Sequence, residues 1–261
     1  MSEYETIRVE RQGPALVLNL HRPDRRNAVS LKMMAEIIAA VAVAEDDAES
    51  RTIILYGGRD YFSAGADLTE AVQVKTATDG TRYFNQWHAL NSALEHASKP
   101  VIAAIEGFCM TGGLELALAA DLRVAGEGSS FAITSARIGT VAGAGGTQRL
   151  PRVVGMANAL DMLFAAEPID AAEALRIGLV NRLTERGGAL AKAQEMAELY
   201  ATRAPLSLAF VKRAVHRGMQ MDLASAIEFE TFLVTTVYGT RDKQEGIGAF
   251  LEKRPARFVG A

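Results

Sequence analysis

A glutamate follows a pair of glycines in the segment Thr111-Gly112-Gly113-Leu114-Glu115, where a helix is expected to begin. Glycine lets the backbone approach another group closely, and the first N–H groups of a helix have no partners within it. Such donors suit an oxyanion or a developing enolate, and Glu115, one turn further on, can face the same point. Glutamate is also common in first turns, where it merely complements the helix dipole. Taken alone, the segment favours that simpler structural role.

Two other loops contain the small residues that a ligand-facing backbone needs. Residues 62–67 read Phe-Ser-Ala-Gly-Ala-Asp, for which an ordinary strand-to-helix turn with Asp67 as N-cap is the simpler interpretation. Residues 139–150 carry four glycines before a helix. They lack the third glycine of the dinucleotide fingerprint, because Gln148 stands there, and the Gly-Lys-Ser/Thr of a phosphate-binding loop. The chain also has no Gly-x-Ser-x-Gly nucleophile elbow.

Strands and helices alternate along most of the chain and would position these loops. Strands are expected at residues 7–9 with 16–20, 52–56, 101–105 and 121–125, with helices after Ser30, over 69–98 with a break near Asp79-Gly80, and over 111–120. The central strands are too uniformly apolar for a sheet with one wet face. The fold class expected is therefore α/β with buried strands.

The last part of the chain changes character and is predominantly helical. Helices are expected over 171–177, 188–202, 206–217 and 222–238, with a short strand near 179–183. We therefore expect a core of residues 1–187, which holds the site, and a helical region of residues 188–261.

Composition narrows the classes of function. The 261 residues carry 28 basic and 31 acidic side chains, a net charge of −3, which argues against nucleic acid as a partner. Four scattered histidines have no zinc-ligand spacing, so no metal is expected. Cys109 is alone, and no signal peptide or membrane-spanning run is visible, so a cytoplasmic protein without membrane contact is expected.

Taken together, the motifs resemble those of the crotonase superfamily, also called the enoyl-CoA hydratase/isomerase family. Each is weak alone, but their order and spacing are specific, and they cover nearly the whole chain. They are Arg22-Pro23 with residues 27–30, then residues 62–68, 99–107, 112–117, 143–150 and 249–254. The resemblance implies a spiral of ββα units with a C-terminal helical region that forms trimers, often paired into hexamers.

The resemblance also implies a site and its substrate, an acyl-CoA thioester, with no cofactor other than the CoA that the substrate carries. Two backbone N–H groups, which fall on Ala64 and Gly112, hold the thioester oxygen. CoA contacts fall on two segments of the core and on the C-terminal end, the latter reaching CoA in a neighbouring subunit. These contact residues are Arg25, Arg26, Ala28, Ala64, Gly65, Ala66, Asp67, Leu68, Gly112, Phe250 and Lys253.

One catalytic position departs from the family pattern. Hydratases use two glutamates; the first falls on Glu115, but the second falls on Ser135, a poor general acid. Reversible hydration of a 2-enoyl-CoA, with Glu115 as the lone carboxylate and Ser135 beside it, is the leading hypothesis. Decarboxylation of a malonyl-type acyl-CoA is the main alternative, because it needs no acid at position 135. Isomerisation, thioester hydrolysis and acyl-CoA binding without turnover stay open.

Overall fold

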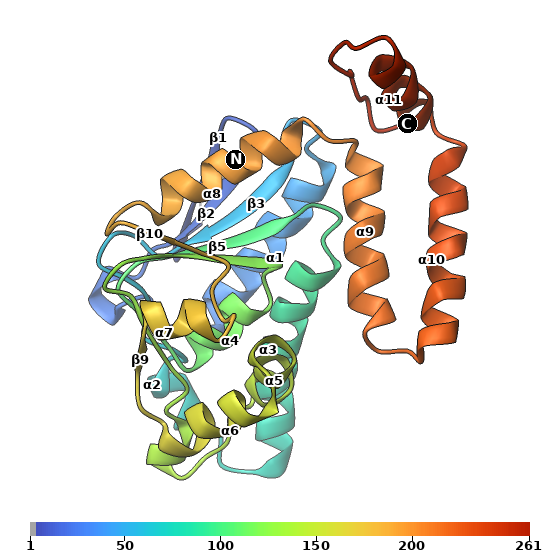
Figure 1. Ribbon diagram of the computed structural model, residues 1–261. Coiled ribbons are helices and arrows are strands. Elements are labelled where there is room, and N and C mark those ends of the chain that lie inside the picture. The colour runs from blue at the N-terminus through green and yellow to red at the C-terminus, as the bar shows by residue number, and fades with distance from the viewer. Residues whose placement is uncertain (1–3) are drawn as a thin grey trace.

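The computed structural model describes residues 4–261, whose strands form two sheets (Figure 1). Within those residues the larger sheet has the order β1-β2-β3-β5-β7-β10 and the smaller one the order β4-β6-β8-β9. The strands are β1 (Ile7–Gln12), β2 (Ala15–Leu20), β3 (Thr52–Tyr56), β4 (Tyr61–Ser63), β5 (Val101–Ile105), β6 (Phe108–Met110), β7 (Leu122–Gly126), β8 (Ser130–Ala132), β9 (Ile169–Asp170) and β10 (Arg182–Thr184). The helices are η1 (Pro23–Arg25), α1 (Leu31–Asp46), α2 (Leu68–Ala71), α3 (Ala77–His96), α4 (Gly112–Leu118), η2 (Ser135–Ile138), α5 (Gly146–Val154), α6 (Met156–Ala165), α7 (Ala171–Arg176), α8 (Ala189–Ala201), α9 (Pro205–Gly218), α10 (Leu223–Tyr238) and α11 (Arg241–Leu251).

The central strands are buried on both faces, which confirms the α/β prediction. Every residue of β3 and β5 is buried. Alternate side chains point to opposite faces of a sheet. Accordingly, Ile53 and Leu55 join the apolar cluster that includes side chains of α1 and α3, while Ile54 joins a second cluster beneath α8. Because both faces of β3 and β5 are covered, the residues of these strands are almost all apolar.

The chain advances as a spiral in which each turn gives one strand to each sheet. The pairs β3 and β4, β5 and β6, and β7 and β8 are consecutive in sequence, yet the first of each pair lies in the larger sheet and the second in the smaller. Neighbouring turns pair in parallel in both sheets. The crotonase-like spiral expected from the resemblance is therefore present. The short strands of the smaller sheet were not predicted individually, because three residues carry too little periodicity.

The expected helix over 69–98 is two helices, and the expected break was misplaced. The chain leaves α2 at Ala71 and re-enters a helix at Ala77. Thr76 and Asp79 form a reciprocal capping box that starts α3, so Asp79 begins the helix instead of ending one. Gly80 then lies inside the first turns of α3. The pattern Thr-x-x-Asp at residues 76–79 could have predicted this helix start.

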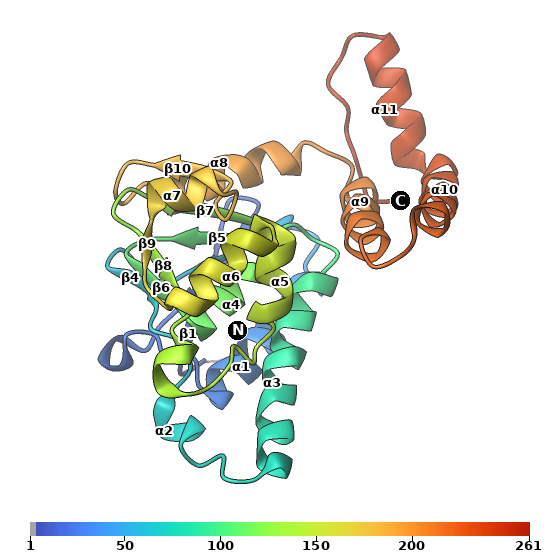
Figure 2. The ribbon, with the colours of Figure 1, turned by 60° about the horizontal axis from the view of Figure 1, so that its bottom comes forward.

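Helix α8 packs on the larger sheet, although it falls in the helical region expected to begin at residue 188. Its buried residues Ala189, Ala193 and Ala197 pack on the second face of the larger sheet. Helices α9 to α11 instead stand out from the body as an arm, seen from two directions in Figures 1 and 2. A boundary at residue 187 would separate α8 from the sheet on which it packs, whereas the arm begins with α9.

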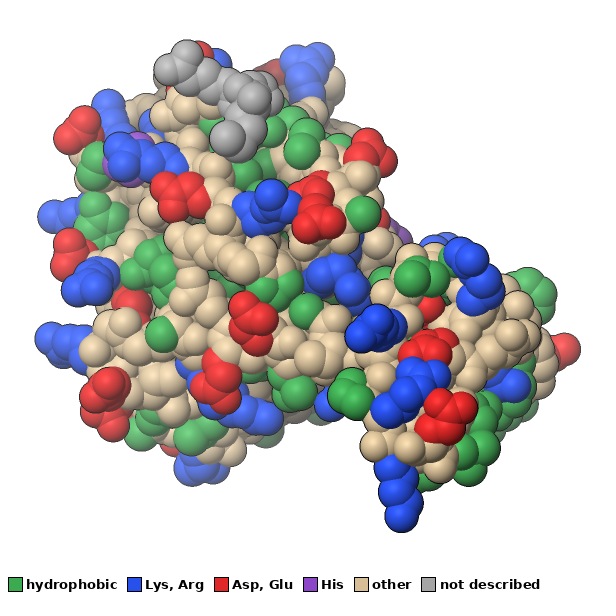
Figure 3. All heavy atoms as spheres, turned by 90° about the horizontal axis from the view of Figure 1, so that it is seen from above, with side chains coloured by type: hydrophobic (Ala, Val, Ile, Leu, Met, Phe, Trp, Pro, Cys, Tyr) green, Lys and Arg blue, Asp and Glu red, His purple; other side chains and the backbone are tan. Residues whose placement is uncertain are grey.

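The surface mixes both signs of charge. Viewed from above, Lys and Arg side chains are interspersed with Asp and Glu over the body, and the arm forms a separate lobe (Figure 3). In the part of the chain that the structure describes, no helix has the length and apolarity needed to cross a membrane.

Candidate active site

Thr111 turns the chain abruptly from β6 into α4. It is not a glycine, yet its φ is +43°. Residues in such sparsely populated conformations persist only when their surroundings hold them. Here the Thr111 amide donates to the Ala132 carbonyl (2.7 Å), and its hydroxyl bonds both the hydroxyl (2.8 Å) and the amide (3.1 Å) of Thr134. The Gly112 amide, first in the helix, donates to no acceptor within residues 4–261.

The loop after β4 lies directly against this helix start. A Cβ on Gly112 would lie 3.0 Å from the Ala66 nitrogen and 2.8 Å from Cη2 of Trp87, and a Cβ on Gly113 would lie 2.7 Å from that of Ser63. Gly65 has a φ of +112°, which favours glycine. The glycines are therefore required by close packing of two backbones, as the sequence suggested.

The amide paired with Gly112 is that of Ala66, and the expectation for Ala64 is wrong. The Ala64 N–H donates to the Arg26 carbonyl at 3.0 Å, so it is already used. The Ala66 N–H, two residues on, donates to no acceptor in the described chain and lies beside Gly112. The two uncommitted amides are consequently those of residues 66 and 112.

Glu115 is buried one turn behind these amides, in a helix whose seven residues are all buried. Its Oε1 accepts hydrogen bonds from the amides of Ala144 and Gly146, both at 2.8 Å. Burial raises the pKa of Glu115 to about 7, although both amides and the Arg149 guanidinium oppose the rise. A carboxyl with such a pKa can take and return a proton near neutral pH.

This raised pKa predicts a loss of stability as the pH rises. The unfolded chain releases the Glu115 proton near the ordinary pKa of 4.5, whereas the folded chain holds it until about 7. The free energy of unfolding should therefore fall between these two values, by up to about 3 kcal/mol. Urea denaturation of the wild type and Glu115→Gln at about pH 5 and about pH 8 measures it. Equal pH dependence in the two proteins would contradict the prediction.

Ser135 lies at the start of η2 and is buried. Its carbonyl accepts from the Thr140 amide (3.1 Å), and its hydroxyl has no hydrogen-bond partner within residues 4–261. The neighbouring Thr134 contacts Thr111 at the start of α4. Position 135 thus belongs to the segment that supports the site, and it supplies a neutral hydroxyl where the family pattern has a second carboxylate.

The two core segments expected to contact CoA run side by side. The Val29 amide donates to the Gly65 carbonyl (2.7 Å), and the Asp67 amide donates to the Val29 carbonyl (3.0 Å). Leu68 is 64% exposed at the start of α2. Arg25, Arg26 and Ala28 precede Val29 on the adjoining segment, so the structure brings these expected positions to one edge.

The Asp67 carboxylate is committed within the protein. It is 4% exposed, pairs with Arg22 at 2.8 Å, and caps α2 through the Thr69 amide at 3.0 Å. Its carboxylate therefore fixes the loop, and the expected contact of residue 67 with CoA stays a prediction. Phe250, at the end of α11, is 83% exposed, and Lys253 follows it. Within one chain the arm holds both far from α2 (Figures 1 and 2).

Helix α3 contributes two polar residues that the sequence analysis did not identify, Asn91 and Glu95. Tyr83, Trp87, Asn91 and Glu95 recur every four residues and therefore share one face. Trp87 packs on Gly112, and Asn91 donates to the Ala144 carbonyl at 2.6 Å. The Tyr83 hydroxyl is buried without a hydrogen-bond partner within the described residues. The four-residue spacing of aromatic and polar side chains was the signal that could have identified this face.

Groups that could bind metal or react as thiols are not gathered here. Within residues 4–261, no cluster of three or more His, Cys, Asp or Glu side chains could hold a metal ion. Cys109 in β6 is fully buried, and burial raises the pKa of its thiol.

The paired sheets built from successive ββα turns, with a helical arm, define a crotonase-like protein. The family model described as enoyl-CoA hydratase/isomerase matches residues 10–261. The chain belongs to the enoyl-CoA hydratase/isomerase family.

Its relatives match end to end. It is 36% identical over 253 residues to the short-chain-enoyl-CoA hydratase of Clostridium acetobutylicum, covering 97% of each chain. It is also 36% identical over 257 residues to the crotonyl-CoA hydratase of Syntrophomonas wolfei, covering 98% of each. The crystal structure of an enoyl-CoA hydratase from Bacillus anthracis superposes with a TM-score of 0.93 at 33% identity, covering 98% of this chain and 100% of that one.

Proposed function

We propose that this chain is a lyase that reversibly hydrates a 2-enoyl-CoA. The observation that carries the proposal is a buried carboxyl, with its pKa raised to about 7, one helical turn from two uncommitted backbone amides. Relatives that match the chain over 97–98% of their length are named short-chain-enoyl-CoA and crotonyl-CoA hydratases. The site and the relatives support the same chemistry.

In the proposed reaction the Glu115 carboxylate takes a proton from water as the water oxygen adds to C3 of the enoyl group. The π electrons of the C2–C3 bond shift toward the thioester and leave negative charge on its oxygen. The amides of Ala66 and Gly112 donate to that oxygen. Removing one preorganised donor of this kind typically costs about 2.7–4 kcal/mol of transition-state stabilisation.

A single carboxyl can complete the cycle. Protonated Glu115 returns its proton to C2, the thioester carbonyl re-forms, and the carboxylate is regenerated. Ser135 then needs to supply only a neutral hydrogen bond, which its uncommitted hydroxyl allows. Because hydration changes no overall oxidation state, the reaction needs no redox cofactor, and CoA enters as part of the substrate.

The direct test is the loss of absorbance of the enoyl-thioester band when short and branched 2-enoyl-CoAs are mixed with the protein. We expect rapid loss of absorbance with the wild type and a much slower loss with Glu115→Gln. Mass spectrometry should show the addition of one water. No change with any enoyl-CoA of the panel would reject the proposal.

Decarboxylation of a malonyl-type acyl-CoA is the second candidate, and Ser135 is the observation that favours it. Loss of CO2 leaves an enolate that the same two amides would hold, and no second carboxyl is needed. Release of CO2 from methylmalonyl-CoA or ethylmalonyl-CoA, without hydration of enoyl-CoAs, would favour this reaction over the first.

The proposed enzyme works as a cytoplasmic homo-oligomer, a trimer or a dimer of trimers. Exposed apolar side chains on the arm support assembly: Val215, Met219, Leu223 and Phe232 are 58%, 70%, 75% and 67% exposed. In such an assembly Phe250 and Lys253 would reach the CoA of a neighbouring subunit. The two core segments, with Arg25, Arg26, Ala28 and residues 64–68, would contact the nucleotide of their own subunit's substrate.

A further inference from the structure

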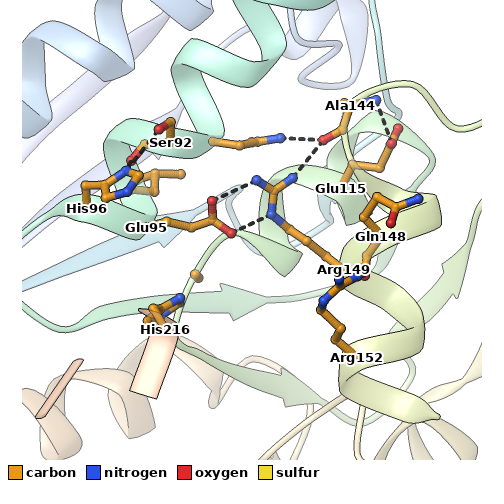
Figure 4. A network of polar contacts seen from close by, with 12 residues as sticks. Ser92, Glu95, His96, Glu115, Ala144, Gln148, Arg149, Arg152 and His216 are labelled. Atoms are coloured by element: carbon orange, nitrogen blue, oxygen red, sulfur yellow. Dashed lines mark hydrogen bonds and ion pairs between the residues drawn. The ribbon is translucent and has the colours of Figure 1, made fainter. Parts of the chain in front are cut away.

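An ion pair on the far side of the glycine-rich loop connects to Glu115 through the backbone of Ala144 (Figure 4). Arg149 of α5 donates to both carboxylate oxygens of Glu95 in α3, at 2.6 and 2.8 Å. The same guanidinium donates through Nη1 to the Ala144 carbonyl at 3.1 Å, and Asn91 donates to that carbonyl at 2.6 Å. The N–H of Ala144 donates to Glu115.

The loop that carries Ala144 depends on such external contacts. Gly145 has a φ of +99°, and residues 140–145 form no regular helix or strand. A loop with this composition samples many conformations unless side chains from elsewhere hold it. On one side Gly143 packs against the ring of Phe84, because a Cβ there would lie 2.3 Å from Cε1. On the other side the Ala144 carbonyl is held by Arg149 and Asn91.

The geometry of the ion pair suits a positioning role. A bidentate Arg–carboxylate pair fixes both the place and the orientation of the guanidinium. Its two side chains are only 20% and 24% exposed, so water screens the pair less than it screens surface pairs. Arg149 lies in the first turn of α5. The same helix starts at Gly146, whose amide is the second donor to Glu115.

We propose that Glu95 and Arg149 are positioning residues, which hold the backbone of Ala144 so that Glu115 is oriented for proton transfer. The inference rests on the proposed hydration, because that reaction gives Glu115 its role. The Arg149 side chain bonds Glu95 and the Ala144 carbonyl, not Glu115 itself, so it acts through the loop.

Removing the charge of Arg149 should change the pKa of Glu115, an effect that simple loss of packing would not produce. Burial raises the pKa of Glu115, whereas the guanidinium of Arg149 lowers it. Tyr83 of α3 also interacts electrostatically with Glu115. The ion pair itself lines a groove of about 850 Å³ between the body and α9, together with His88, Arg152, Lys212 and His216. Titration must therefore be followed at Glu115 itself.

The experiment measures the pKa of Glu115 in the substrate-free full-length protein by carbon NMR of labelled glutamate, with Glu115→Gln used to assign the signal. Arg149→Met should raise that pKa by about half a unit or more, because it removes a cation. It should lower kcat by about 10- to 100-fold with little change in KM. The acid limb of the kcat profile should move to higher pH with the same sign.

A second variant and a control separate positioning from general damage. Glu95→Gln keeps the Arg149 cation, so it should lower kcat without raising the pKa of Glu115. Arg176→Met removes an exposed arginine that pairs with Glu173 at 2.6 Å, and should change neither quantity. If Arg149→Met does not fold, Arg149→Lys and Glu95→Gln decide the matter, since both should lower kcat at an unraised pKa.

Two results would overturn the proposal: a Glu115 pKa that does not rise in folded Arg149→Met, or a kcat within about twofold of wild type in every folded variant. The titration needs no substrate, so it stands apart from the proposed reaction. If the wild type hydrates enoyl-CoAs but the pKa does not respond, only the positioning role falls. If the wild type hydrates none, the proposed function falls.

Discussion

Glu115→Gln should reduce kcat for enoyl-CoA hydration by about 10²- to 10⁴-fold, the usual contribution of a general acid–base group. Glutamine has nearly the same shape, and its side-chain oxygen can still accept from the amides of Ala144 and Gly146. It has no proton to exchange with water or with C2. KM should therefore change little, because the amides that bind the thioester oxygen are untouched. Steady-state kinetics at saturating crotonyl-CoA measures the effect.

Glu106 offers a matched control for this substitution. It is another buried glutamate, 1% exposed, and it too accepts two backbone amides, from Gly187 (3.0 Å) and Ala189 (2.9 Å). It joins the start of α8 to the sheet, and both of its donors lie there and not in the loop at Ala66. Glu106→Gln should keep kcat near wild type in the folded protein. If both variants lost activity equally, burial of a carboxylate and not its chemistry would explain the result.

Gly112→Ala should lower kcat by about 10²- to 10³-fold, as expected when an oxyanion donor is lost. The added Cβ would lie 2.8 Å from Cη2 of Trp87 and 3.0 Å from the nitrogen of Ala66. One helix start or one loop must move, and the two amides then no longer converge. Kinetics with crotonyl-CoA, together with thermal unfolding, separates the catalytic loss from the accompanying loss of stability.

A double variant distinguishes steric damage from displacement of the donors. Trp87→Phe shortens the ring that meets the new methyl group, so Gly112→Ala with Trp87→Phe should regain stability. The contact with the Ala66 nitrogen remains, so activity should stay low. Gly218→Ala at the end of α9 is the control, because its Cβ would meet only Ala226 at an ordinary 3.5 Å. Full recovery of kcat in the double variant would exclude Ala66 as the partner donor.

Much of the fold follows from local patterns that the sequence displays. The apolar runs of β3 and β5 predict strands buried on both faces, and Ser30 predicts the start of α1, where its hydroxyl accepts from the Met33 amide. Such features depend on residues close in the chain. The helices α6 and α11 were not predicted, since their exposed apolar side chains blur the periodicity on which a helix prediction depends.

Which residue of the loop after β4 supplies the second donor amide could not be predicted from the sequence alone. Ala64 and Ala66 are the same residue type on either side of Gly65, so composition does not distinguish their amides. The difference arises because the Arg26 carbonyl, 38 residues earlier in the chain, accepts from Ala64. A contact between segments so distant in sequence is set by the folded backbone. Glu115, by contrast, was predictable because it lies one turn after the Gly112 donor in the same helix.

The ladder between β4 and β6 has a consequence for how such a protein diversifies. It pairs Tyr61 with Phe108 and Ser63 with Cys109 just before the two donor amides, so successive turns of the spiral clamp both donors to one rigid frame. The chain between Leu68 and Thr76 leaves that frame and is largely exposed. Insertions or exchanges there can change the surroundings of the site while the two donor amides keep their geometry. Acyl preference and bond polarisation can thus evolve as independent traits.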